Sequence, residues 1–315
     1  MTSTPTSAAP PLLKGGGKGS TAMLRKIRKV ALPYGYLTPT VVLLTILMII
    51  PIVMVVGYSM MNNVIMIKNP VFVGFQHYVE ILTSDAFRNA LQNTLFFDIV
   101  SVVVHLLLGF GFAMMLNSPM LGKVTKSIFR TIYVLPWLFT VAIIAVLWRL
   151  LLEPTGVINY LLMTFHLTTT QIEWLSNPDI ALYAVTFINI WSGYPFYMTS
   201  LLAGLQGIPK DYYEAAEVDG ASGWQKLIYI TLPQLRPIII AMALLDFIWT
   251  TQQFALIWMT TGGGPLGTTE MLSTYTYKFA FSTYQFGSAA ASAVIILVIS
   301  MVLTYLYVRA QKVKY

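Results

Sequence analysis

Residues 203–237 read AGLQGIPKDYYEAAEVDGASGWQKLIYITLPQLRP and lie between two long apolar segments of the chain. Pro209 stands where a helix can begin, because a first helical turn does not need the N–H that proline lacks. Gly220 breaks the helix-forming residues that follow, and a second short helix is expected over residues 224–230, ended by Pro233. The pattern predicts two short helices joined by a turn, with charged and apolar positions interleaved so that one face can dock on another protein.

The composition indicates that lipid surrounds most of the chain. Of its 315 residues, 57% are hydrophobic and only 10% are charged, whereas a soluble domain carries about 25% charged residues. The mean hydropathy is +0.70. A larger core does not explain the shortfall of charge, because a core still needs a wettable surface around it. The chain has no cysteine, which leaves no disulfide framework and no cysteine-based metal or redox site.

Six segments have the length and apolar character of membrane-spanning helices, which need about 20 mostly apolar residues. The fourth is interrupted by the run Trp191-Ser192-Gly193-Tyr194-Pro195, which a membrane tolerates only where protein or a cavity satisfies the freed backbone. We therefore expect an all-α integral membrane protein with six transmembrane helices over residues 31–315. The expected spans are residues 37–58, 93–116, 132–152, 181–202, 237–257 and 289–308.

The distribution of positive charge predicts the orientation of these spans. Fifteen of the 19 Lys and Arg residues fall in the two terminal segments and the even-numbered loops, which would all lie on one side. The positive-inside rule then places both termini in the cytoplasm, and an even number of spans agrees with this. Residues 1–30 are rich in Ser, Thr, Pro and Gly and are expected to form a flexible, basic cytoplasmic tail.

The opening stretch resembles the EAA motif of ABC importer permeases. The version preceded by Ile208-Pro209-Lys210-Asp211 is similar to the carbohydrate-uptake branch of that family, the maltose and glycerol-phosphate permease type, and the likeness covers about residues 35–310. It implies a type I ABC importer permease fold. The matching strings are Glu214-Ala215-Ala216, Asp219-Gly220-Ala221 and Ile230-Thr231-Leu232-Pro233, with Trp191, Pro195-Phe196-Tyr197, Thr261-Gly262-Gly263-Gly264-Pro265 and Phe286-Gly287-Ser288-Ala289-Ala290-Ala291 flanking them.

The resemblance implies that the loop over about residues 205–235 inserts into a groove on a separate cytoplasmic ATPase and carries its motion to the helices. The residue types suit this role. Glu214 can pair with an arginine of the partner, Gly220 permits a turn that a Cβ would strain, and two alanines allow close approach. The alternative is an amphipathic helix that packs on lipid headgroups, with Glu214 solvated. The expected coupling residues are Glu214, Ala215, Ala216, Asp219, Gly220, Leu232 and Pro233.

Polar residues in the fifth span are candidates for a solute path. Asp246 lies nine residues after Pro237, about 14 Å into the bilayer, where a carboxylate must be paired or hydrated. At 100° per residue, Asp246, Trp249, Thr250 and Gln253 share one face, and aromatic rings with amides and hydroxyls suit a sugar. In the resembling family this helix lines the cavity, with an amide pair at Gln252 and Gln253. The alternative is contact between helices. The candidates are Trp249, Gln253, Gln252, Asp246 and Thr250, followed by Trp191 and Tyr197 on the fourth span.

For the other polar residues within the membrane, a structural role is the preferred interpretation. Asp98 and His105 share a face of the second span; a proton relay is one reading, and contact with another helix is preferred. Arg149 and Glu153 have helical i, i+4 spacing, which predicts a structural ion pair. The small residues of the run 288–293 allow close packing of the last helix.

The resemblance implies a multi-pass permease of the bacterial cell (inner) membrane for a sugar, polyol or sugar-like solute. The implied partners are a second, different permease chain, two cytoplasmic ATPase subunits, an extracytoplasmic solute-binding protein and membrane lipid, with no nucleic acid. ATP and Mg would be used by the ATPase subunits, since this chain lacks a phosphate loop. No cofactor, metal or catalytic residue is expected on it.

Two alternatives belong to other classes. An ion-driven secondary transporter working alone would use Asp98, His105 and Asp246 but would leave the loop around Gly220 without a role. A membrane-embedded enzyme would need paired carboxylates, metal ligands or a nucleophile, and the sequence shows no such constellation. The identity of the sugar is not encoded in any motif of the chain.

Overall fold

The structure, a computed structural model, describes residues 34–311, and every regular element in that part of the chain is helical. Within it, the one strand-like pairing is an isolated bridge between Met61 and Phe72. The chain divides into two compact units, residues 1–54 and residues 55–315. The flexible, basic tail predicted for residues 1–30 lies outside the described residues.

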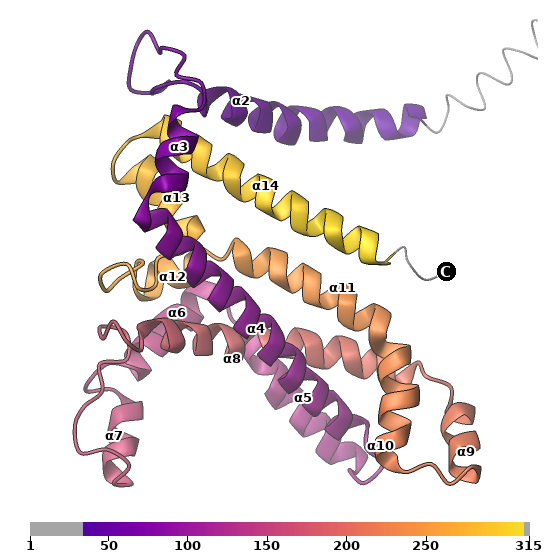
Figure 1. The fold of residues 1–315 in the computed structure, drawn as a ribbon. Coiled ribbons are helices and arrows are strands. Elements are labelled where there is room, and N and C mark those ends of the chain that lie inside the picture. Colours follow the sequence, from indigo (N-terminus) through magenta and orange to yellow (C-terminus); the bar gives the residue numbers. More distant parts are fainter. Residues whose placement is uncertain (1–33, 312–315) are drawn as a thin grey trace, which may run out of the picture. The chain divides into compact units, whose positions relative to one another are not determined.

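The elements follow one another along the chain in the order drawn in Figure 1. The first described helix runs from Tyr34 to Tyr58. It contains a π-helical turn, η1 (Thr45–Ile49), and ends with α2 (Ile50–Tyr58). The remaining elements are α3 (Gln76–Thr83), α4 (Asp85–Asn117), α5 (Lys123–Leu138), α6 (Val141–Leu151), α7 (Val157–Thr164), α8 (Ala181–Gln206), α9 (Lys210–Val218), α10 (Gly223–Lys226), the π-helical turn η2 (Leu227–Thr231), α11 (Leu232–Thr251), α12 (Ala255–Thr260), α13 (Leu272–Phe281) and α14 (Phe286–Gln311).

Four helices in the described part of the chain are long and apolar enough to cross a membrane, or five if the bent pair α5 and α6 counts as one span. α8 has the length of a span, with 26 residues, but its polar and small residues leave it outside this set. Four of the predicted segments therefore correspond to such helices. The four are Tyr34–Tyr58, Asp85–Asn117, Gly223–Thr251 and Phe286–Tyr305.

The predicted third span is wrong as a single helix, because α5 and α6 meet at an angle of 98°. Pro136 lies in the last turn of α5, and the backbone is extended at Phe139. The side chain of Thr140 then caps α6 by accepting from the backbone N–H of Ile143 at 3.4 Å. α6 ends at Leu151, so residue 153 has left the helix and the predicted i, i+4 ion pair with Arg149 does not form.

The predicted interruption of the fourth span is also wrong, because α8 is continuous through Gly193 and Pro195. A proline removes a single backbone hydrogen bond from a helix, and tertiary packing can outweigh that loss. In α8 three residues of the turns after Pro195 are fully buried; Tyr197, Met198 and Leu201 pack in a core shared with α4 and α11.

The prediction that the second short helix ends at Pro233 is wrong. The fifth span also has different limits from those predicted. One uninterrupted helix of 29 residues runs from Gly223 to Thr251 and includes α10, η2 and α11. We call it the long helix. It stops six residues before the predicted end at Ile257. The break over residues 252–254 separates it from the short helix α12.

The π-helical turns explain how two prolines are accommodated within helices. η1 ends two residues before Pro51, and η2 ends two residues before Pro233. In each turn the backbone bond reaches back five residues, as from the N–H of Leu232 to the carbonyl of Leu227. A wider turn relieves the clash between the proline ring and the carbonyl four residues earlier.

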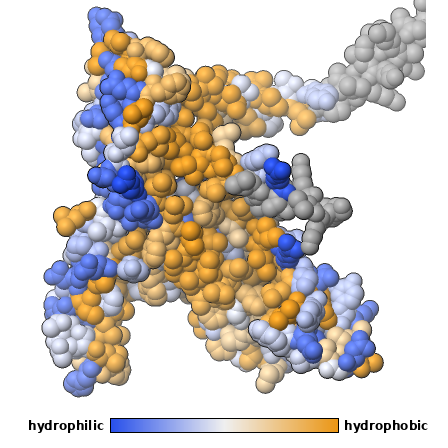
Figure 2. Space-filling model, in the orientation of Figure 1, coloured by the Kyte–Doolittle hydropathy of each residue, from blue (hydrophilic) through white to orange (hydrophobic). Residues whose placement is uncertain are grey.

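The core of the second unit lies where α4 runs along α8, with α11 packed against both (Figure 1). In Figure 2 apolar side chains form a continuous surface over this group, and hydrophilic residues gather around α9 and α7. The exposed apolar residues include Leu107, with 64% of its surface accessible. Such a surface fits lipid or another apolar partner. The small-residue run at the start of α14 is buried from Ser288 to Ser292, as predicted.

Candidate functional site

The segment with the EAA-like motif forms a compact hairpin of α9, a turn and α10. We call residues 210–226 the hairpin. Gly220 has φ +74°, the left-handed region that favours glycine, so the predicted role of this residue in the turn is confirmed. The N–H of Ala221 donates to the carbonyl of Ala216 at 2.8 Å, which closes the end of α9. Ser222 and Gln225 then form a capping box that begins α10.

Two side-chain contacts hold the hairpin in shape. Lys226 Nζ lies 2.8 Å from Glu217 Oε1 and joins α10 to α9. The hydroxyl groups of Tyr213 and Thr231 are 2.9 Å apart and join α9 to η2 at the base of the long helix. The sequence did not indicate either pair, because both depend on the way the turn folds back.

The hairpin presents a mixed surface to its surroundings. Glu214 is exposed at the middle of α9, and no salt bridge to it is present in the described part of the chain. Val218 and Trp224 are 88% and 69% exposed on either side of the turn. Sequence reasoning missed these two apolar side chains, although their place beside the glycine turn is a usable signal. The other expected coupling residues are also accessible: Ala215, Asp219, Gly220 and Pro233 are exposed, and Ala216 and Leu232 are half-buried.

The predicted solute-path residues of the fifth span do not share one face. Asp246 and Thr250 are buried, with 8% and 6% of their surface accessible, whereas Trp249 is 58% exposed. Gln252 and Gln253 follow the end of the long helix and lie in the break before α12. The prediction of a common face is therefore wrong for two reasons: Trp249 turns to the exposed side of the helix, away from Asp246 and Thr250, and the helix ends before Gln253.

The break itself is held by backbone contacts. The N–H of Gln253 donates to the carbonyl of Thr250 at 2.9 Å. The hydroxyl group of Ser273, on α13, donates to the carbonyl of Gln253 at 2.9 Å. The side chain of Gln252 is exposed and that of Gln253 is half-buried. Both amides therefore remain at least partly accessible.

Three aromatic side chains from three helices form an accessible group that we call the aromatic patch. Phe196 of α8 lies between Trp249 of α11 and Trp137 of α5, at ring distances of 5.5 and 6.4 Å. Trp137 is 54% exposed, and Phe196 is half-buried. Sequence reasoning found Trp249 alone, because the bend between α5 and α6 and the continuity of α8 decide where the other two rings lie.

The two candidates on α8 are less accessible. Tyr197 is fully buried, and its ring lies 6.0 Å from that of His105. Trp191 is half-buried and packs edge to face on Trp148 at 5.4 Å. Neither side chain lies in the aromatic patch.

Buried polar side chains join α4, α8 and α11, and we call them the polar cluster. His105 is 1% exposed and stands at its centre. Its Nδ1 lies 2.8 Å from Oδ2 of Asp246, and its Nε2 lies 3.1 Å from the carbonyl oxygen of Asn189. Thr250 donates to the other carboxylate oxygen of Asp246 at 3.2 Å, and the Asn189 amide donates to Ser101 at 3.0 Å. The preferred interpretation of His105 as an interhelical contact is confirmed.

The hydrogen-bond partners of His105 fix the charge of the pair. A backbone carbonyl only accepts, so Nε2 of His105 carries its hydrogen and donates to Asn189. One further proton lies between Nδ1 and the carboxylate of Asp246. The pair is neutral overall whichever atom holds that proton, which is the arrangement that a buried site tolerates.

Asp98 makes a separate contact between α4 and the long helix. Its Oδ2 lies 2.6 Å from the hydroxyl oxygen of Thr251, which also lies 2.8 Å from the carbonyl of Phe247. A threonine has a single hydroxyl proton, so both contacts are hydrogen bonds only if Asp98 supplies the second one. Asp98 and His105 thus reach different residues of the long helix rather than each other.

Two glycines make room for the polar cluster. A Cβ at Gly193 would lie 2.3 Å from Nε2 of His105, so this residue leaves space for the imidazole. A Cβ at Gly109 would lie 2.3 Å from the Cβ of Tyr197 and 2.8 Å from the backbone N of Met198. α4 and α8 therefore approach each other closely at these two positions.

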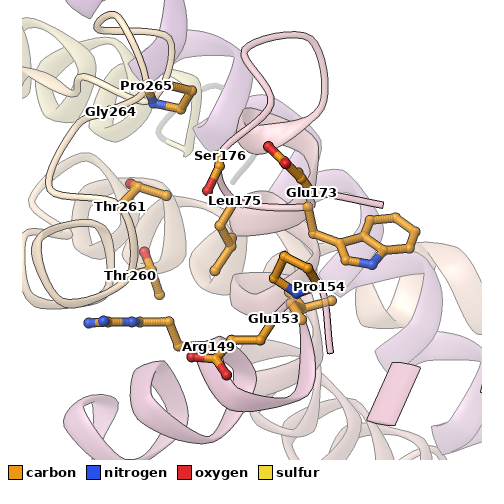
Figure 3. A pocket seen from close by; sticks show the side chains of 12 residues that line it. Arg149, Glu153, Pro154, Glu173, Leu175, Ser176, Thr260, Thr261, Gly264 and Pro265 are labelled. Atoms are coloured by element: carbon orange, nitrogen blue, oxygen red, sulfur yellow. The ribbon is translucent and has the colours of Figure 1, made fainter. Parts of the chain in front are cut away.

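A polar cavity of about 580 Å³ lies between the end of α6, the segment before α8 and the end of α12 (Figure 3). Figure 3 shows Thr260 and Thr261 on the left and Glu173 at the upper right, with Glu153 at the bottom beside Arg149, whose guanidinium points to the left. Within residues 34–311, no group of three or more His, Asp or Glu residues is placed to hold a metal ion.

The chain belongs to the family of binding-protein-dependent transport system inner membrane components, whose model matches residues 105–312. This confirms the predicted kinship with ABC importer permeases. The protein is accordingly a multi-pass membrane transport component of the inner membrane and not an enzyme.

Two relatives align along nearly the whole chain. The trehalose/maltose transport system permease protein MalF of Thermococcus litoralis is 33% identical over 90% of this chain and 95% of the relative. The diacetylchitobiose uptake system permease protein DasB of Streptomyces coelicolor is 30% identical over 94% of this chain and 91% of the relative.

Solved structures show the same fold. A chain in the crystal structure of a bacterial alginate ABC transporter, in complex with an alginate pentasaccharide-bound periplasmic protein, superposes with a TM-score of 0.78. Its sequence is 25% identical to this one, and the match covers 90% of this chain and 94% of that chain. That structure is a transporter with a periplasmic protein bound, which agrees with the description of the family.

Proposed function

We propose that this protein is the permease subunit of an ATP-driven importer that takes up a sugar or a sugar-like solute such as a polyol. The observation that carries the proposal is the hairpin joined without a break to the long helix. The hairpin offers Glu214, Val218 and Trp224 to a partner, and the long helix leads from it to the aromatic patch. The names of the relatives, which refer to trehalose, maltose and diacetylchitobiose, support a carbohydrate as the solute.

In this proposal six spans cross the inner membrane with both termini in the cytoplasm. α8 would be a span whose polar residues face protein, since Asn189 and Thr186 are buried in the described unit. The bent pair of α5 and α6 would form one further span. The hairpin then lies on the cytoplasmic side, together with the positive charges near Lys126 and Arg236.

The hairpin would dock in a groove of a cytoplasmic ATPase subunit. Glu214 is available for an arginine of the partner, and the exposed Val218 and Trp224 add apolar contact. ATP and Mg would be bound by two such ATPase subunits. The full assembly would include a second, different permease chain and a solute-binding protein on the outer side.

The solute would pass the aromatic patch and the amides beside it. Aromatic rings stack on the apolar faces of a sugar, and amide groups bond its hydroxyls. Trp249, Gln252 and Gln253 are accessible, whereas Asp246 and Thr250 are engaged in the polar cluster. Trp249, Phe196 and Trp137 are therefore the first candidates for contact, and the ring of Tyr197 packs against that of Phe196 at 5.9 Å.

The test uses the complex isolated from its source cells in mild detergent and returned to liposomes. Uptake of labelled trehalose, maltose and diacetylchitobiose is measured with and without internal ATP, in the presence of the co-isolated binding protein. We expect ATP-dependent uptake of at least one of these sugars and its persistence with a protonophore. Isolation without any ATP-hydrolysing polypeptide, or uptake that a protonophore abolishes at constant ATP, would contradict the proposal.

A further inference from the structure

The long helix carries the hairpin at one end and the polar cluster near the other. Asp246 is 23 residues after Gly223, a distance of about 35 Å along a helix. The first part of this helix has few polar bonds to neighbouring helices, whereas Asp246 and Thr251, near its far end, both bond to residues of α4. A displacement at the hairpin therefore meets its first buried polar bonds to α4 near the polar cluster.

Two bonds attach the far end of the long helix to α4. His105 holds Asp246, and seven residues earlier on α4 Asp98 holds Thr251. The residue order shows that the two helices run antiparallel at this point. Two attachments at different positions along the long helix fix its rotation as well as its position. A single attachment would leave the helix free to rotate.

The same histidine attaches α8. Nε2 of His105 donates to Asn189, and the Asn189 amide donates to Ser101 of α4. The imidazole lies against Gly193, because any residue with a Cβ at that position would clash with it. His105 is thus the residue through which three helices are held together.

No hydrophobic effect draws helices together in lipid, so their register depends on close packing and on interhelical hydrogen bonds. The bonds of His105 are directional and lie where water is absent. Separation of His105 from Asp246 would leave two buried polar groups unpaired, which is strongly unfavourable. The clustered bonds therefore act together with the close packing at Gly109 and Gly193 to keep α4, α8 and α11 in register.

We propose that His105 is a positioning residue for transport. Its bonds to Asp246 of α11 and to Asn189 of α8, which we call the clasp, hold these helices to α4, so that displacement of the hairpin moves the three helices as one body. Phe196 of α8 and Trp249 of α11 belong to two of the clasped helices, so the clasp also keeps two rings of the aromatic patch together. The role of the hairpin in this inference rests on the proposed function. The clasp itself rests on the buried bonds alone.

The first test compares uptake with ATP hydrolysis in the reconstituted complex, with labelled maltose and trehalose as the probes. The double variant His105→Leu with Asp246→Leu removes the clasp without leaving an unpaired buried charge. We expect it to hydrolyse ATP and to lose uptake per ATP by roughly tenfold or more, the size expected for one charge-assisted buried bond. His105→Gln keeps an N–H donor and is expected to recover part of the loss.

The matched control removes a buried pair that lies outside the clasp. Thr276 of α13 and Ser292 of α14 are joined at 2.6 Å, and Ser292 is fully buried. Thr276→Val with Ser292→Ala should leave uptake per ATP at the wild-type value. An unchanged ratio in the double leucine variant would overturn the proposal. So would a parallel fall of uptake and hydrolysis in it, since that result indicates a structural role only.

A second measurement tests the clasp without a solute. The chain has no cysteine, so spin labels can be placed through Leu107→Cys on α4 and Leu245→Cys on α11, both exposed. With the clasp intact we expect the same distance between labels with and without ATP and vanadate, and in the double leucine variant a shifted or broadened distance. A distance that the double leucine substitution does not alter would refute the clasp. A wild-type complex without ATP-dependent uptake would instead refute the proposed function, and the label distance would still report on the clasp.

Discussion

The hairpin and the polar cluster belong to the same long helix, yet they are built from opposite kinds of contact. The hairpin consists of neighbours in sequence and exposes most of its side chains. The polar cluster joins residues as far apart as 141 positions, such as His105 and Asp246, and hides them from solvent. A surface meant for a partner can be local, because the partner supplies the rest of the contact. A buried joint must be completed by the chain itself.

The comparison predicts that the shape of the hairpin depends above all on its turn. Gly220→Pro would impose φ near −65° where the chain has +74°. We expect uptake to fall to background while the subunit still inserts into the membrane, measured by transport assay and by the amount of membrane-bound protein. Gly223→Ala is the matched control, since open space surrounds that residue and its φ is not positive. Normal transport in Gly220→Pro would contradict the importance of the turn.

The polar cluster is expected to be sensitive to a single methyl group. Gly193→Ala places a Cβ 2.3 Å from the imidazole of His105, which must move and weaken its bonds. Overpacking of this kind costs about 1–3 kcal/mol, and we expect a lower thermal unfolding midpoint in detergent. Gly111→Ala on α4 meets no atom within 4 Å and should leave the midpoint unchanged. Equal midpoints for the two variants would show that His105 is not held as described.

The aromatic patch should respond in affinity more than in stability. Trp249→Ala removes one exposed ring and Phe196→Ala removes the ring beside it. An aromatic contact contributes about 0.5–1.5 kcal/mol, so we expect KM for uptake to rise about twofold to tenfold in each variant. Tyr183→Ala is the control, because that exposed ring packs on Phe96 of α4 and lies outside the patch. Unchanged KM values for Trp249→Ala and Phe196→Ala would remove the patch from the solute path.

The ion pair within the hairpin should matter least. Lys226 and Glu217 have 21% and 64% of their side-chain surface accessible. An exposed pair of this kind contributes about 0–1 kcal/mol, so Glu217→Gln should change uptake and stability within experimental error. Uptake and stability of Glu217→Gln and of the wild type are measured at low and at high salt. Any small difference between them at low salt should disappear at high salt, because salt screens the ion pair. A large loss of transport would mean that Glu217 contacts the ATPase. Glu217 would then belong to the docking surface and not only to the hairpin's internal contacts.

Sequence reasoning located the hairpin because its signals are local. Pro209, Gly220 and the residues between them indicate a helix start, a helix end and a turn without reference to the rest of the fold. The same reasoning failed at Pro233, where a π-helical turn carries the helix past a residue that usually ends one. It also failed at Pro136 and Pro195, because packing decides whether a proline bends a helix or is absorbed by it.

The solute-path candidates show the same limit. Helical periodicity placed Asp246, Thr250, Trp249 and Gln253 together, but Trp249 turns to the exposed side and the helix ends before Gln253. The break after Thr251 depends on contacts with α13, through Ser273. Trp137 and Phe196 could not be found from the sequence, since no pattern shows which ring of another helix lies beside Trp249.

The sequence by itself determined the apolar segments, the bias of positive charge, the turn at Gly220 and the kinship with importer permeases, because each of these is a property of neighbouring residues. The tertiary structure alone decided that His105 meets Asp246, that α5 and α6 bend apart and that three aromatic rings gather on three helices. Those outcomes depend on which helices pack together. In lipid, close packing and buried polar bonds between distant residues together fix that choice.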